Sequence, residues 1–318
     1  MLLIVKEEKL MLVSVIICTH NPTLDYLNRT LLALKAQSIS FSQWELLMVD
    51  NGSKTTVAEL FDLSWHPFGR HIREEKLGLT AARIRGIEEA QGDLIVFVDD
   101  DNCLKENYLN VLISTMESMP MLGVLGAGRI IPEFETEPAL VELPFLRSLA
   151  IRDEQRSYFS NEVKYHKAIP FGAGMCIRRS IALFYVNSCA TRPFAASLDR
   201  NGNALLSGGD IDLALHACRE GYLAGVLPEL ELIHLIPKAR LEHDYLIKIA
   251  AGHAASSYIL SQLWKFEEYP ENPCIKWGRH WKNRIKAKGL ARKILVAEYK
   301  AEREASLKWK VLTSQNIL

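Results

Sequence analysis

The sequence has no apolar run long enough to cross a membrane. A spanning helix needs about 18 or more consecutive apolar residues, and no stretch of the chain approaches that length. The short apolar segment 1–5 is followed at once by the charged residues 6–9, which does not fit a signal peptide. Basic and acidic side chains number 38 each, so no overall field would attract nucleic acid. We therefore expect a cytoplasmic protein that does not bind nucleic acid.

The sequence also lacks the patterns that bind zinc or dinucleotides. Its six cysteines form no C-x-x-C pair and none lies at zinc spacing from a histidine, so we expect reduced, mostly buried thiols. Gly126 and Gly128 form a G-x-G, but the third glycine of the dinucleotide fingerprint is missing. Both absences direct attention to carboxylates as the candidate chemical groups.

The most informative stretch that is present is a run of three aspartates, Asp99, Asp100 and Asp101, directly after the apolar residues 94–98. The apolar part is short and does not alternate, which is typical of a strand buried on both faces of a parallel sheet. Acids at its carboxyl end would lie where open α/β sheets bind ligands. Adjacent carboxylates repel one another unless a cation lies among them, and their oxygens suit Mg²⁺ or Mn²⁺. The alternative is a solvated acidic turn.

The surrounding segments predict an α/β fold with a doubly wound, mostly parallel sheet and helices on both faces. Buried strands are expected over residues 13–18, 44–49 and 124–131. Helices are expected after the first of these strands and after the strand that ends in the three aspartates. The first strand ends in Thr19, His20 and Asn21, and the second ends in Asp50. Polar residues therefore gather at the carboxyl ends of neighbouring strands.

The second half of the chain carries further candidates, each with a structural alternative. Gly172 and Gly174 precede a short strand and would allow close approach of a ligand or simply form a tight turn. Asp210 and Asp212 lie in the first turn of a helix over residues 208–222, where either could act as a cap. They are two residues apart, so only one can face a given atom. His234 is a lone histidine in an apolar run, which suits a core residue or a ligand.

The C-terminal part differs in composition. A long helix is expected over residues 246–263, and residues 276–310 are rich in Lys and Arg, with Trp277, Trp281 and Trp309 interleaved. A basic segment with tryptophans can lie on an anionic membrane surface, here the inner face of the membrane. The alternatives are a solvated helical tail and an oligomer contact.

Several of these motifs, in this order over roughly residues 11–236, resemble the glycosyltransferase family 2 proteins of GT-A fold. The segments that match are 13–21, 49–53, 78–86, the D-x-D motif at 99–101, 172–179 and 208–222. The chain departs from the family pattern at Cys18, His20 and Gly209, which stand where Pro, Tyr and Glu are usual. The resemblance implies a GT-A domain over 1–236, with a nucleotide-sugar half at 11–130 and an acceptor half at 131–236. A helical, basic extension would follow at 237–318.

The resemblance implies an inverting transfer of a sugar from a nucleotide-diphosphate sugar, such as a UDP-sugar, to a hydroxyl of a carbohydrate or lipid-linked acceptor. It implies a Mn²⁺ or Mg²⁺ cofactor held by Asp101, Asp99 and His234, and Asp210 as the catalytic base. The acceptor side would include Gly172, Gly174 and Asp212. The nucleotide-sugar-binding residues would be Thr19, His20, Asn21, Asp50, Arg83, Asp99 and Asp100.

Two other classes of protein remain open from the sequence. A sugar-nucleotide pyrophosphorylase would need a Gly-rich, Arg-containing loop directly after the first strand, and residues 19–22 lack it. An inactive nucleotide-sugar-binding or scaffold protein is the second class. The aspartates at 99, 101 and 210 argue against it, whereas Gly209 leaves room for it.

Overall fold

The computed structural model describes residues 13–192, 198–200, 205–266 and 285–314. Four strands form the parallel part of one sheet, in the order β3-β2-β1-β4. They are β1 (Val13–Thr19), β2 (Trp44–Asp50), β3 (Gly69–Arg73) and β4 (Leu94–Asp99). The three expected strands at 13–18, 44–49 and 94–98 are confirmed. Their apolar runs are continuous because both faces of the sheet are covered.

The second part of the sheet is mixed. Its strands are β5 (Asn102–Leu104), β6 (Leu122–Phe134), β9 (Cys176–Arg178) and β10 (Leu223–Ile236), with the short β7 (Arg152–Asp153) and β8 (Tyr158–Ser160) at its margin. The long β6–β10 pairing is parallel, whereas β9 lies antiparallel between β4 and β6. β10 also pairs antiparallel with β5. The sequence shows two apolar runs here, 225–227 and 230–236, and both belong to the one strand β10, whose register shifts after Leu227.

Helices cover both faces of the sheet, as predicted. α1 (Leu24–Lys35) and α4 (Tyr108–Ser118) pack against Val13, Val15 and Ile17 of β1. Ile16 points to the other face, because successive strand residues alternate, and packs there with α3 (Leu79–Glu89), α5 (Arg179–Thr191) and α6 (Gly209–Arg219). The composition of residues 187–206 predicts a variable loop, but its first residues, 187–191, form the end of α5. The remaining short helices are α2 (Val57–Leu60), η1 (Phe41–Gln43), η2 (Leu143–Leu149) and η4 (Lys238–Leu241).

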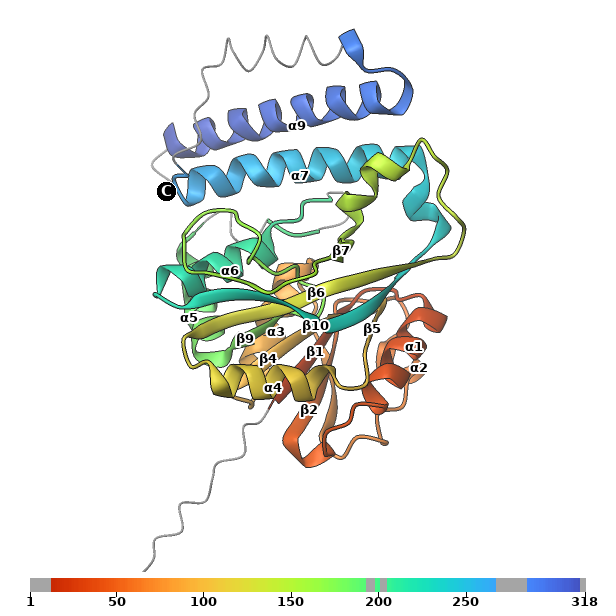
Figure 1. The fold of residues 1–318 in the computed structure, drawn as a ribbon, viewed down its shortest axis with the longest axis vertical. Helices are drawn as coiled ribbons and strands as arrows, with labels where there is room; N and C mark the ends of the chain where they lie inside the picture. Colours follow the sequence, from red (N-terminus) through yellow and green to blue (C-terminus); the bar gives the residue numbers. More distant parts are fainter. Residues whose placement is uncertain (1–12, 193–197, 201–204, 267–284, 315–318) are drawn as a thin grey trace, which may run out of the picture.

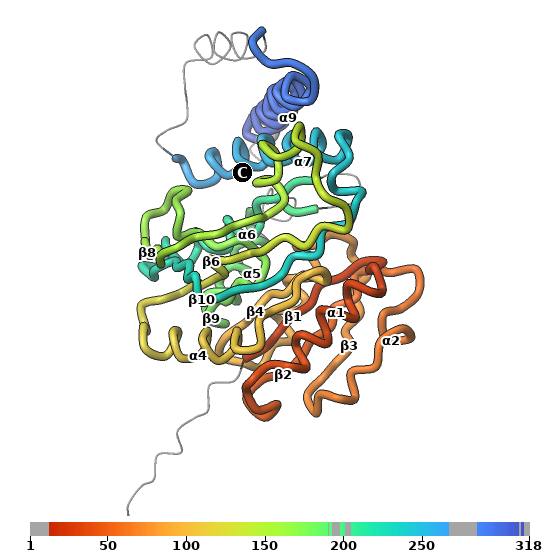
Figure 2. Tube along the Cα trace, turned by 45° about the vertical axis from the view of Figure 1, so that its right-hand side comes forward, coloured from red at the N-terminus to blue at the C-terminus, as the bar shows by residue number. Residues whose placement is uncertain are grey.

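The predicted C-terminal helices are present as α7 (His243–Leu263) and α9 (Gly289–Ser314), which pack along each other at the end of the molecule away from β2 (Figures 1 and 2). They are not detached from the sheet. Leu149 of η2, Ile236 of β10, Leu246 of α7 and Leu290 of α9 belong to one buried cluster. The expected boundary after residue 236 therefore falls inside a shared core.

Part of the tail prediction lies outside the described residues, including Trp277 and Trp281. Within the described helices, none combines the length and the apolar character that crossing a bilayer requires.

Candidate functional site

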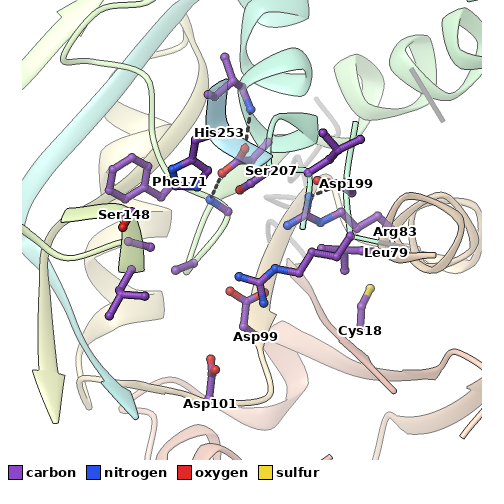
Figure 3. A pocket seen from close by; sticks show the side chains of 18 of the residues that line it. Cys18, Leu79, Arg83, Asp99, Asp101, Ser148, Phe171, Asp199, Ser207 and His253 are labelled. Carbon is purple, nitrogen blue, oxygen red and sulfur yellow. Dashed lines mark hydrogen bonds and ion pairs between the residues drawn. The ribbon is translucent and has the colours of Figure 1, made fainter. Parts of the chain in front are cut away.

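A cavity of about 1380 Å³ opens at the carboxyl ends of β1 and β4, between the sheet and α7 (Figure 3). Both parts of the sheet contribute to its lining. The carboxylates that line it are Asp99, Asp100, Asp101, Asp199 and Asp210. The cations that line it are Arg83, Arg147, Lys164, Arg200, Arg240 and Lys265. Opposite charges close together in a sheltered space can bind a charged ligand through several groups at once.

The three adjacent aspartates have different partners. β4 ends at Asp99, and the next two residues turn away from the strand direction. Asp100 accepts a short hydrogen bond from Oγ1 of Thr19, at the end of the neighbouring β1. Asp101 is buried and accepts hydrogen bonds from Arg240 Nη2 at 2.7 Å and from Asn102 Nδ2 at 3.0 Å. The run is therefore part of the cavity wall and is not a solvated turn.

These partners separate the acidities of the three groups. Burial, together with the charge of Asp101, raises the pKa of Asp99 and raises that of Asp100 to about 7. Burial also acts on Asp101, but the charge of the neighbouring Arg240 outweighs it and holds its pKa well below the usual range. Asp101 is accordingly the carboxylate that stays ionised, which is the form that binds a metal ion.

His234 reaches Asp101 because β10 pairs with β5, where His234 lies opposite Asn102. Its Nε2 lies 3.6 Å from Asp101 Oδ2 and 2.9 Å from Arg240 Nη1. Arginine can only donate, so Nε2 accepts and carries the lone pair that a metal would use. The Nδ1 atom is buried without a hydrogen-bond partner.

The residues present fit a divalent ion that is shared with a substrate. In the described part of the chain, no cluster of three His, Cys, Asp or Glu side chains could hold an ion by itself. Mg²⁺, however, is commonly bound through one or two carboxylates together with substrate phosphates. Asp101 and His234 supply such a partial set, and Asp99 lines the same cavity (Figure 3).

Asp210 lies in the first turn of α6 and lines the same cavity as Asp101. Its Oδ2 accepts a hydrogen bond from Gly172 N at 2.8 Å, and its Oδ1 accepts one from Ile211 N at 2.9 Å. Burial raises its pKa, although the charge of Arg83 opposes this effect. A carboxylate with a raised pKa at the edge of a cavity is suited to accept a proton.

Gly172 is required by a close approach. A Cβ atom at this position would lie 2.6 Å from Arg83 Nη2 and 3.4 Å from Asp210 Cβ. The glycine therefore allows a guanidinium and a carboxylate to lie near its backbone. Gly174 has a different role from the one expected. It does not line the cavity, its φ is +71°, and its carbonyl accepts a hydrogen bond from Tyr108 Oη at 2.8 Å.

Asp212, which was predicted on the acceptor side, does not line the cavity. Its side chain is fully buried and accepts hydrogen bonds from Arg192 Nη2 and Trp264 Nε1, both at 2.7 Å. Residues two apart on a helix point in different directions, so Asp210 faces the cavity while Asp212 ties α6 to the end of α7.

The predicted nucleotide-side residues divide into two groups. Thr19, His20 and Asn21 line the cavity, and their loop is fixed to the turn after β2. His20 Nδ1 lies 2.6 Å from the carbonyl oxygen of Asn51, and Asn21 N donates to Ser53 Oγ at 2.8 Å.

Asp50 does not line the cavity. Its carboxylate accepts hydrogen bonds from the backbone N–H groups of Ser53 and Val57. It also forms an ion pair with Arg73 at 2.7 Å. Burial would raise its pKa, but these hydrogen bonds outweigh burial and lower it. Its position supports a role in shaping the turn and does not support the predicted contact with the nucleotide base.

Arg83 lines the cavity as predicted and is buried on α3. Burial alone would lower its pKa, but the charges of Asp199 and Asp210 outweigh burial and raise it. The guanidinium is therefore a permanent cation, and it lies beside Asp199 in the cavity wall (Figure 3). Cys18 also lines the cavity, but burial raises its pKa to about 12, so the thiol is not a nucleophile at neutral pH.

Asp199 and Arg240 were missed in the sequence. Asp199 lies in the stretch that was interpreted as a variable loop, and Arg240 lies beyond the expected domain boundary. Neither belongs to a local pattern, since each meets its partner across more than a hundred residues.

Comparison with known proteins gives a consistent result. The model of the family described as glycosyl transferase family 2 matches residues 14–184. The glucosyl-dolichyl phosphate glucuronosyltransferase of Haloferax volcanii is 28% identical over 131 residues, which cover 39% of this chain and 40% of that protein. The glycosyltransferase AglE of the same organism is 33% identical over 107 residues, 33% of this chain and 35% of that one. The matches thus span 40% or less of these relatives.

Among solved structures, S. aureus TarS 1–349 in complex with UDP superposes with a TM-score of 0.51 at 13% identity, covering 96% of this chain and 92% of that one. The complex of the same protein with UDP-GlcNAc gives a TM-score of 0.52 at 12% identity, over 80% and 65% of the two chains. At this level of identity the likeness establishes the fold.

Proposed function

The chain belongs to glycosyltransferase family 2 and has the GT-A fold, and on that premise we propose that it transfers a sugar from a UDP-sugar to a hydroxyl acceptor. The observation that carries the proposal is the single cavity that holds the end of β4, Arg83 and Asp210. Groups that would bind a diphosphate thus face a group that would accept a proton. The family assignment favours this class over a pyrophosphorylase.

Donor binding is assigned to the walls made by β1, β4 and α3. Thr19, His20 and Asn21 would contact the nucleoside, and Arg83 would face the diphosphate, whose negative charge grows as the bond to the sugar breaks. The UDP and UDP-GlcNAc complexes of TarS support a uridine nucleotide as the donor.

A Mn²⁺ or Mg²⁺ ion is proposed to bind with the donor, held by Asp101, His234 and Asp99. Bound there, it would supply positive charge to the leaving diphosphate. The low pKa of Asp101 keeps that carboxylate ionised and available at neutral pH. Arg240, which contacts both Asp101 and His234, lines the same cavity.

Transfer is proposed to occur by single displacement with inversion. The acceptor oxygen forms its bond to the anomeric carbon while the bond from that carbon to the diphosphate oxygen breaks, and the nucleoside diphosphate leaves with the electron pair. The proton of the acceptor hydroxyl passes to a carboxylate oxygen of Asp210. The backbone N–H of Gly172 orients that carboxylate.

The acceptor is proposed to be a carbohydrate or a lipid-linked sugar that enters beside η2. Arg147, Ser148, Lys164 and Tyr165 line that part of the cavity. All belong to the half 131–236 that the family resemblance assigns to acceptor binding. A relative named for action on glucosyl-dolichyl phosphate supports a lipid-linked acceptor.

We also propose a peripheral membrane contact through α9. Leu307 and Val311 are exposed and one turn apart, so they lie on one face of the helix. Lys308 and Lys310 flank them. An apolar face with basic neighbours suits the surface of an anionic bilayer.

The proposed function is tested by UDP binding and by slow hydrolysis of UDP-sugars. Calorimetry should give a Kd for UDP at least about tenfold lower with MnCl₂ than with EDTA, and Asp101→Asn should remove that difference. One of UDP-glucose, UDP-GlcNAc or UDP-glucuronate should release UDP. A purified wild-type protein that neither binds UDP nor hydrolyses any donor would refute the proposal.

A further inference from the structure

We propose that Asp199 is a positioning residue of the reaction centre, which takes the space that a side chain at position 209 would fill and keeps Arg83 apart from the base Asp210. The inference rests on the proposed function of the same site and adds a residue that the sequence pattern did not assign.

Asp199 connects two helices that carry functional side chains. It is buried, and its Oδ2 accepts hydrogen bonds from Thr80 Oγ1 at 3.0 Å and from Arg83 Nη1 at 3.1 Å on α3. Its Oδ1 accepts one from Gly209 N at 3.2 Å, at the start of α6. Figure 3 shows Asp199 and Arg83 side by side in the cavity wall.

The backbone around Asp199 makes the same connection. The carbonyl of Arg200 accepts a hydrogen bond from Leu79 N at 3.1 Å, and the carbonyl of Leu198 accepts one from Gly208 N at 3.0 Å. Residues 198–200 therefore join the first turns of α3 and α6. A carboxylate held on both sides in this way has little freedom to move.

Asp199 can occupy this place only because residue 209 is glycine. A Cβ atom at 209 would lie 2.2 Å from Asp199 Oδ2 and 2.5 Å from its Cγ, which no real contact allows. The two positions thus compete for one space. At position 209 the chain has glycine where the family usually has Glu, and the carboxylate of Asp199, from another segment, occupies the space next to it.

The charge of Asp199 has a consequence for Asp210. Gly172 allows Arg83 Nη2 to approach Asp210 closely, and an unshared guanidinium would hold that carboxylate in an ion pair and make it a weaker base. Asp199 accepts a hydrogen bond from the same guanidinium, so the charge of Arg83 is divided between two carboxylates. Two further titratable groups interact electrostatically with Asp210: Arg152 on β7, and His253 on α7, which lines the cavity.

The test is a set of variants assayed for UDP release from the UDP-sugar that the wild type hydrolyses. Asp199→Asn should lower kcat by about 10- to 100-fold with KM changed less than about threefold, because orientation of the base acts on the chemical step. The acid limb of its pH–rate profile should move to lower pH, since the loss of a negative neighbour lowers the pKa of Asp210. Glu45→Gln is the matched control, because Glu45 is also buried and paired with an arginine but lies at the far end of β2.

A double-mutant cycle tests the shared space. Gly209→Glu alone should lower kcat, since its side chain meets Asp199. In the Asp199→Ala background the same substitution should raise kcat at least about tenfold, because its carboxylate can then reach Arg83. A wild-type kcat and pH profile in Asp199→Asn, or a double variant no better than Asp199→Ala, would overturn the inference while the proposed function stands.

A wild-type protein that neither binds nor hydrolyses UDP-sugars would instead remove the proposed function. Urea unfolding then decides the geometric part without any ligand. Gly209→Ala should lower the free energy of unfolding of the wild type. In the Asp199→Ala background, the same substitution should lower it by at most about half as much. Equal costs in both backgrounds would refute the shared space as well.

Discussion

The guanidinium of Arg240 lies 2.7 Å from Oδ2 of Asp101, so the carboxylate proposed to bind a metal already has a cation beside it. The same guanidinium donates to His234, the second proposed ligand. Arg240 therefore stabilises Asp101 and His234 when no nucleotide sugar is bound. A metal ion that binds to these two residues would have to compete with the guanidinium.

Arg240→Gln should have opposite effects on stability and on metal binding. The protein should lose about 2–4 kcal/mol in urea unfolding, because a buried carboxylate loses its partner. The Mn²⁺ concentration at the midpoint of UDP binding should fall at least about threefold, since Asp101 and His234 are released. Arg29→Gln, which breaks an exposed ion pair with Glu133, should change neither. An unchanged midpoint in Arg240→Gln would show that the guanidinium does not compete with the ion.

Asp210→Asn should bind UDP within about twofold of the wild type but lose transfer or hydrolysis by about 100- to 10,000-fold. In the wild type, the rate should fall as the pH falls through the raised pKa of Asp210, so the acid limb should lie above the ordinary value of 3.8. Turnover that survives in Asp210→Asn would assign the base elsewhere.

Asp212→Asn should separate structure from catalysis. Its carboxylate is fully buried against Arg192 and Trp264, so the loss of charge should cost about 2–4 kcal/mol of stability. Because the side chain faces away from the cavity, KM for the donor should change less than about twofold at a temperature where the variant is folded. A large rise in this KM would show that Asp212 takes part in substrate binding.

The stability of the protein should decrease as the pH falls from about 6.5 to about 4. Burial lowers the pKa of both His66 and His216 to about 4, whereas the unfolded chain binds protons near pH 6.5. The unfolded state therefore takes up more protons in this range, at a cost of about 1–3 kcal/mol for each histidine. His66 packs against Trp44 and Phe41, so His66→Phe should flatten the pH dependence of urea unfolding. A slope equal to that of the wild type would contradict this assignment.

The membrane contact should depend on the exposed face of α9. Leu307→Glu with Val311→Glu should reduce sedimentation with vesicles that contain phosphatidylserine by at least about fivefold. Point variants are preferred to truncation because Leu290 and Ile294 of the same helix are part of a buried core. Met121→Glu, at an exposed apolar residue before β6, is the control. Equal loss in both proteins, or no loss in either, would argue against a role of α9.

The sequence predicted the parts of the fold that depend on local patterns. The buried strands of the first half and the amphipathic helices between them follow from runs of apolar residues, and the acids at the end of β4 follow from their position. Helix α5 was missed, because no helix was predicted over residues 179–186 and its end, 187–191, was classed as a loop from its composition.

The contacts that complete the site depend on long-range pairing. His234 meets Asp101 only because β10 bends past β5, and Arg240 follows from that path. Asp199 reaches Arg83 from a segment with no periodic pattern. For Asp212, the expected two-residue spacing already implied opposite directions, and the neighbouring Trp264 and Arg192 determined which acid was buried.

The buried cluster that joins η2, β10, α7 and α9 affects how acceptor specificity could be exchanged between relatives. Residues 147–150, which line the proposed acceptor side, lie at the end of η2, which contacts α7, and α7 in turn lies along α9. A chimera that receives only the acceptor segment of another enzyme would place that segment on a mismatched support. Successful recombination of these enzymes would need α7 to travel with the segment that it carries.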